Sequence, residues 1–63
     1  MSIIHLESLA RTESATLTIS VGPSGGSITW KVHGHRAERI AFYSPTTTEE
    51  LAQAMLARLS VTR

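Results

Sequence analysis

Residues 15–33 read ATLTISVGPSGGSITWKVH, and this stretch decides the fold. Its first part, residues 15–21, alternates apolar and hydroxyl side chains with a period of two, which is typical of a strand with one buried face. Residues 22–26 contain a proline and three glycines, so they predict a hairpin connection. Alternation resumes at residue 27, and the apolar positions of this second strand are Ile28, Trp30 and Val32. Because Trp30 shares its side with the other two, we expect it in the core.

A third strand follows a second turn. Gly34 marks that turn, and residues 37–43 alternate again, with Ile40 and Phe42 opposed to their neighbours. Three consecutive strands joined by short turns predict an antiparallel meander.

A helix is predicted after Pro45. Thr46 or Thr47 can serve as its N-cap, since each has a glutamate three residues later, which is the capping-box spacing. At helical spacing one contiguous face is apolar, and it consists of Leu51, Ala52, Met55, Leu56 and Leu59. Such a helix laid across the meander buries both apolar surfaces.

Residues 2–14 fit two patterns. Ile4 and Leu6 alternate with their neighbours as in a strand, whereas Ile3, Leu6 and Ala10 form a short helical stripe. Two isoleucines near the start favour a strand. We therefore expect one α+β domain over residues 1–63, an antiparallel β-meander of three to four strands with one C-terminal helix packed on one face.

Composition excludes several classes of protein. The 63 residues carry a net charge of +1 and contain no cysteine, so a disulfide framework and a thiol nucleophile are excluded. No apolar run approaches the roughly 18–20 residues of a membrane span, and we expect a cytoplasmic location in a host cell. A core this small rarely supplies more than about 3–5 kcal/mol, so self-association or a large partner is expected.

Little in the chain points to catalysis or metal binding. The pair His33 and His35 flanks a glycine, and His5 is the other histidine, but a metal site usually needs three or four converging donors. The chain has no aspartate to orient a histidine and no nucleophile elbow. We expect no enzyme activity, no cofactor and no metal.

The sheet side opposite the predicted helix is the candidate contact surface. Its side chains are Thr16, Thr18, Ser20, Thr29, Lys31, His33, Arg39 and Tyr43. Tyrosine and arginine are enriched at binding hot spots, and threonines offer a flat hydrogen-bonding surface. The candidate partner-binding residues are Lys31, His33, Arg36, Arg39 and Tyr43. Edge strands offer a second route, through strand addition by a partner or by a second copy in a homodimer.

The layout of residues 27–59 resembles the three-strand-plus-helix DNA-binding domains of plant transcription factors and of tyrosine-recombinase arm-binding domains. In them a threonine–glutamate segment, here residues 47–50, also opens the packing helix. The resemblance implies a sheet laid in the major groove, read by several arginines. This chain provides Lys31 and Arg39 on that side, with Arg36 near the turn. DNA affinity depends largely on phosphate neutralisation, and this chain offers fewer cations than those domains, so nucleic-acid binding is the alternative function and not the first expectation.

Residues 3–59 resemble a small type I-F anti-CRISPR protein in layout: an apolar N-terminal segment, three strands around glycine turns, and a helix capped by Ser/Thr and Glu. The resemblance implies a phage-encoded or mobile-element inhibitor that binds a host protein or ribonucleoprotein complex. We accordingly expect a non-catalytic protein-binding module that acts through its sheet face. A homo-oligomeric structural protein is a further alternative.

Overall fold

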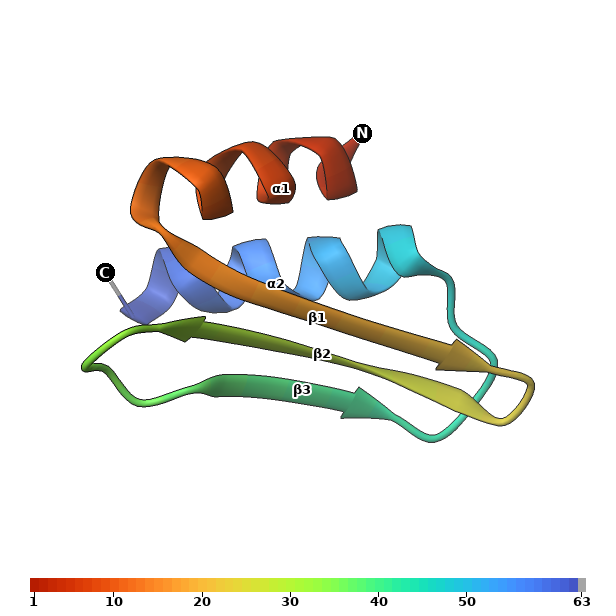
Figure 1. Ribbon diagram of the computed structural model, residues 1–63. Coiled ribbons are helices and arrows are strands. Elements are labelled where there is room, and N and C mark those ends of the chain that lie inside the picture. The colour runs from red at the N-terminus through yellow and green to blue at the C-terminus, as the bar shows by residue number, and fades with distance from the viewer. Residues whose placement is uncertain (63) are drawn as a thin grey trace.

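Two helices lie on one side of a three-stranded antiparallel sheet (Figure 1). The computed structural model describes residues 1–62. The elements are, in chain order, α1 (Ser2–Glu13), β1 (Ala15–Gly22), β2 (Gly25–Val32), β3 (Glu38–Phe42) and α2 (Thr48–Thr62). The strand order is β1-β2-β3, so β2 is central and the other two strands form the edges. The predicted α+β class, meander and C-terminal helix are confirmed.

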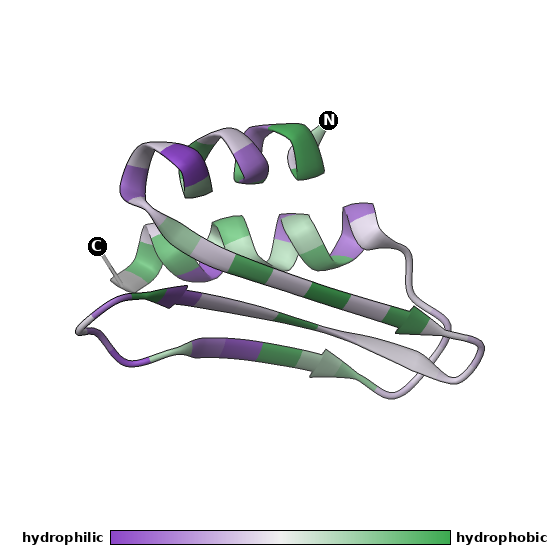
Figure 2. Cartoon of the chain, viewed as in Figure 1, coloured by the Kyte–Doolittle hydropathy of each residue, from purple (hydrophilic) through white to green (hydrophobic). Residues whose placement is uncertain are grey.

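The register of the sheet follows from the alternation in the sequence. Ile28 lies opposite both Ile19 and Ile40, and Trp30 lies opposite Leu17. These side chains face the helices, and Ile28 and Trp30 are buried at 0% and 3% exposure. Figure 2 shows the same alternation along β1 as green hydrophobic bands separated by pale bands of nearly neutral hydropathy. The core position predicted for Trp30 is therefore confirmed.

The first hairpin is tighter than the sequence suggested. Gly22 pairs with Gly25, so β2 begins inside the predicted turn and only residues 23–24 connect the strands. The next residue, Gly26, lies under α2. A Cβ atom there would lie 3.2 Å from a methyl carbon of Leu51 and 3.0 Å from the carbonyl oxygen of Ser20. The missing side chain thus lets the first turn of α2 approach the sheet closely.

The prediction for residues 2–14 is wrong, because they form helix α1 and not a first strand. The helical stripe noted in the sequence is the one that is buried: Leu6 is 0% and Ala10 7% exposed, and Ile3 packs against the same core. As a helix, the segment buries this stripe between α2 and β1. As an additional strand it would have extended one edge of the sheet and left α2 uncovered on that side.

Ser14 alone joins α1 to β1. It has the left-handed conformation (φ 56°, ψ 39°), and its backbone N–H donates to the carbonyl oxygens of Ala10 and Arg11. A left-handed residue at this position is a common helix C-terminus, and glycine adopts it most easily. The single linking residue explains why α1 runs back alongside β1 (Figure 1).

Ser14→Gly is expected to stabilise the fold by about 0.5–1 kcal/mol, since it removes left-handed strain of about 1–2 kcal/mol at the cost of extra chain entropy. The midpoint of urea unfolding should rise. Ser8→Gly is the matched control, because Ser8 is exposed in the middle of α1 and glycine there should lower the midpoint. Equal decreases in both variants would contradict the explanation for Ser14.

The start of α2 confirms the predicted capping box. Among the two threonine–glutamate pairs, Thr47 and Glu50 form it: the Glu50 N–H donates to Thr47 Oγ1 at 3.2 Å, and the Thr47 N–H donates to Glu50 Oε1 at 3.0 Å. The predicted apolar face is also confirmed. Its buried members are Leu51, Ala52, Met55 and Leu59, with Leu56 partly buried beside them.

Candidate binding surface

The side of the sheet opposite the helices is its open face. Its side chains alternate with the buried ones, and no helix of residues 1–62 covers them (Figure 1). The open face consists of Thr16, Thr18, Ser20, Ser27, Thr29, Lys31, Arg39 and Ala41. Most of these side chains carry hydroxyl groups, so the face is able to donate and accept hydrogen bonds.

Lys31 and Arg39 are the two charged groups of the open face. Arg39 lies opposite Thr29 in the ladder, so Lys31 is its diagonal neighbour at about 7–8 Å between backbones. Both side chains are exposed, and within residues 1–62 neither forms an ion pair with a carboxylate. The Lys31 ammonium donates to the backbone carbonyl of His35, which holds it toward the turn between β2 and β3. The face thus presents two adjacent positive charges among hydroxyls.

The other three candidate residues lie apart from this pair. His33 and Arg36 belong to the turn between β2 and β3, and Arg36 lines a cavity on the helix side. Tyr43 is 91% exposed just after β3 ends. It is four residues from Arg39, about 13 Å along an extended strand. The structure therefore groups only Lys31 and Arg39 on the open face, with Tyr43 at the opposite end from the turn.

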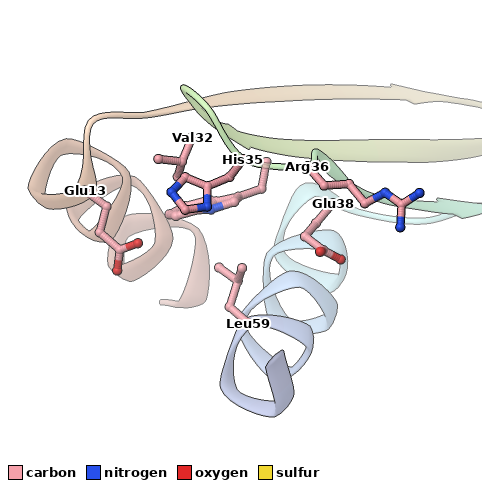
Figure 3. A pocket seen from close by; sticks show the side chains of 7 residues that line it. Glu13, Val32, His35, Arg36, Glu38 and Leu59 are labelled. Atoms are coloured by element: carbon pink, nitrogen blue, oxygen red, sulfur yellow. The ribbon is translucent and has the colours of Figure 1, made fainter. Parts of the chain in front are cut away.

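A cavity of about 280 Å³ lies where the ends of both helices meet the turn between β2 and β3. Its lining residues are Glu13, Trp30, Val32, His35, Arg36, Glu38 and Leu59. Figure 3 shows Glu13 and Glu38 on opposite sides of it, with His35 between them. Glu38 Oε1 lies 3.2 Å from Arg58 Nε, so this carboxylate is already occupied by an ion pair.

We did not predict this cavity from the sequence, because we expected an N-terminal strand. Glu13 lines the cavity only when this segment forms helix α1. The volume of the cavity lies just below the range for small-molecule sites, roughly 300–1,000 Å³. The bottom of the cavity is formed by the core residues Trp30 and Leu59. Its rim is polar, because His35 and Arg36 of the turn lie there. The cavity is therefore a shallow depression at one end of the hydrophobic core.

The three histidines do not converge. His33 and His35 flank Gly34 in the turn, whereas His5 borders a shallow hollow with Met1 and Glu49 where the two helices begin. Within the described residues, no group of three or more histidine, aspartate, glutamate or cysteine side chains is placed to hold a metal ion.

No protein-family model, curated protein or solved structure matches the chain. Neither helix in the part of the chain that the structure describes has both the length and the apolar character needed to cross a membrane.

Proposed function

We propose that this protein is a non-catalytic binding module whose open face docks on an acidic surface of a partner protein. The observation that supports the proposal is that one whole face of the sheet has no helix packed on it, because both helices lie on the other side. The charged groups on this open face are the cations Lys31 and Arg39. A flat row of hydroxyls around two adjacent positive charges is complementary to carboxylates that lie on a flat surface.

Binding is favoured over catalysis by the position of the polar groups. The polar groups of the open face project from the surface of the sheet, where water reaches them. Reactive sites, by contrast, usually lie in a concave and mostly apolar pocket. The cavity beside Trp30 is concave, but its Glu38 carboxylate is held by Arg58. An inhibitor of a host complex is the sharper form of this proposal and comes from the anti-CRISPR resemblance alone, since no comparison identifies such a protein.

A protein partner is favoured over DNA by the number of cations. If the open face bound nucleic acid through Lys31 and Arg39, the logarithm of affinity would fall with the logarithm of salt concentration with a slope of only about −2. Dedicated DNA binders commonly contact about 6–10 phosphates and show far steeper slopes.

Arg39→Glu is expected to weaken binding of the partner by about tenfold or more, because it opposes like charges at the centre of the contact. The partner is first captured from a lysate with the tagged wild-type chain, purified, and titrated by calorimetry. Arg11→Glu is the matched control, since it makes the same charge change on an exposed side chain of α1. It should leave affinity within about twofold of wild type.

Equal weakening by both reversals would mean that net charge and not the open face governs binding, and the proposal would be wrong. A captured species that is nucleic acid, bound with an affinity that Arg39→Glu weakens, would support the DNA-binding alternative instead.

A further inference from the structure

β1 is an edge strand without the features that normally prevent strand pairing. All eight of its residues, Ala15–Gly22, pair in continuous register with β2, so no bulge bends it. It contains no charged residue and no proline, and its other edge faces away from the sheet. A long, regular and uncharged edge strand presents unpaired backbone groups to any chain that can pair with them.

The other edge of the sheet differs in each of these respects. β3 has only five residues, Glu38–Phe42, and begins with two charged side chains. Glu38 forms an ion pair with Arg58 of α2, which ties this edge to the helix layer. Short edge strands with charges are the usual protection against edge-to-edge association. The unprotected edge is therefore specific to β1.

The sequence of β1 is complementary to itself. In an antiparallel pair, facing residues point to the same side of the sheet, so two copies with their helices on the same side pair residues of equal parity. A two-fold axis through Thr18 places the two Thr18 side chains face to face, Thr16 opposite Ser20, and Leu17 opposite Ile19. A two-fold axis through Ile19 places Leu17 opposite Val21 and Thr18 opposite Ser20, and only Thr16 then faces a glycine, Gly22. Either register brings no like charges together.

We propose that β1 pairs antiparallel with β1 of a second copy of this chain about a two-fold axis, which joins the two sheets into one continuous sheet. We choose a second copy of this chain as the partner because β1 carries no charge that would repel another β1, and because its apolar and hydroxyl side chains mostly face residues of the same kind across the axis. Partly buried Leu17 and Ile19, and Val21 at 48% exposure, gain apolar neighbours on the helix side. The paired sheet also joins two open faces, so that two Lys31–Arg39 pairs lie on one surface.

Sedimentation velocity over about 1 µM to about 1 mM tests the proposal with the full chain. We expect a reversible monomer–dimer equilibrium in the wild type. Thr18→Lys and Thr18→Glu are each expected to raise the dimer dissociation constant at least about tenfold, because each brings two like charges close together across the new pairing. An equimolar mixture of the two variants should restore dimers, since opposite charges then face each other.

Ala41→Lys is the matched control, because it adds the same charge on the open face of β3, away from the proposed contact. It should dimerise like the wild type.

Amide hydrogen exchange of β1 should be slowed in the wild-type dimer and faster in Thr18→Lys, while the amides of β2 stay protected in both. A wild-type chain that is monomeric at about 1 mM overturns the proposal. So does a dimer that persists in both Thr18 variants, or a mixture of them that does not associate. None of these outcomes depends on binding to an acidic partner.

Discussion

Leu51→Ala is expected to leave a large fraction of the chain unfolded at room temperature without denaturant. Leu51 is 0% exposed, belongs to the first turn of α2 and packs over Gly26 of the central strand. Removing a buried leucine side chain typically costs about 2–5 kcal/mol, from lost apolar transfer and from the cavity left behind. A single core in a cysteine-free chain of 63 residues rarely supplies more than about 3–5 kcal/mol. The substitution therefore removes most of the available stability.

The measurement is urea unfolding followed by the fluorescence of Trp30, the only tryptophan in the chain. Trp30 is 3% exposed in the folded state, so its emission should shift to longer wavelength when the core opens. Val61→Ala is the matched control on the same helix, because Val61 is 84% exposed. Its midpoint should stay close to that of the wild type. All variants are compared at one low concentration, since dimerisation would make the midpoint depend on protein concentration. A Leu51→Ala midpoint within error of the control would contradict the packing described for α2.

The elements that could be predicted are those whose signals are local. The alternation of residues 15–21, the hairpin glycines and the capping box at Thr47 each depend on residues close together in sequence. They give the meander, its register and the start of α2. The burial of Trp30 follows from the same alternation.

α1 could not be decided in this way, because residues 2–14 satisfy both a strand and a helix pattern. What favours the helix is a contact made far along the chain. The carboxylate of Glu49 accepts hydrogen bonds from the backbone N–H groups of Ser2 and Ile3, which are 47 and 46 residues away in sequence. A helix leaves its first N–H groups without intrahelical partners, and here α2 supplies the acceptor. A local pattern cannot contain this information.

The same division applies to the candidate site. Lys31 and Arg39 lie inside regular strands, so alternation alone was enough to place them on one face. Arg36 and Tyr43 lie outside the strands, where alternation no longer predicts direction. The cavity beside Trp30 is lined in part by Glu13, the last residue of α1. It could therefore not be predicted while residues 2–14 were expected to form a strand.

The carboxylate of Glu49 holds the two helices together at their N-termini. The Ser2 N–H donates to Glu49 Oε2 at 2.7 Å and the Ile3 N–H donates to Oε1 at 3.0 Å, while the Gln53 amide lies 3.4 Å from Oε2. The carboxylate also lies in the first turn of α2, so it interacts with the positive dipole ends of both helices. The backbone hydrogen bonds from Ser2 and then Ile3 lower the pKa of Glu49 from 4.5 to about 2.

Glu49→Gln is expected to destabilise the fold at neutral pH and to abolish part of its acid sensitivity. Because the pKa of Glu49 is lower in the folded state, the ionised carboxylate stabilises that state fully above pH 4.5, and this contribution is lost as pH falls through about 2. Glutamine keeps one acceptor oxygen but has no charge, so it retains at most one of the two backbone hydrogen bonds in their present form. The wild type should therefore unfold at higher urea than the variant at neutral pH, and the two midpoints should converge near pH 2.

Glu7→Gln serves as the charge-matched control, because Glu7 is exposed on α1 and its replacement leaves the contact between the helices intact. Its pH profile should run parallel to that of the wild type. Amide exchange at Leu6 adds a local readout, since loss of the Glu49 contact frees the first turn of α1 and should speed exchange there before the sheet opens. If the Glu49→Gln and wild-type midpoints differed by the same amount at neutral pH and near pH 2, the difference would come from the shape of the side chain. If instead the two unfolding midpoints converge on acidification and exchange at Leu6 is faster in Glu49→Gln, the charge of Glu49 must act on α1 itself. The packing of the N-terminal helix then depends on one carboxylate of α2.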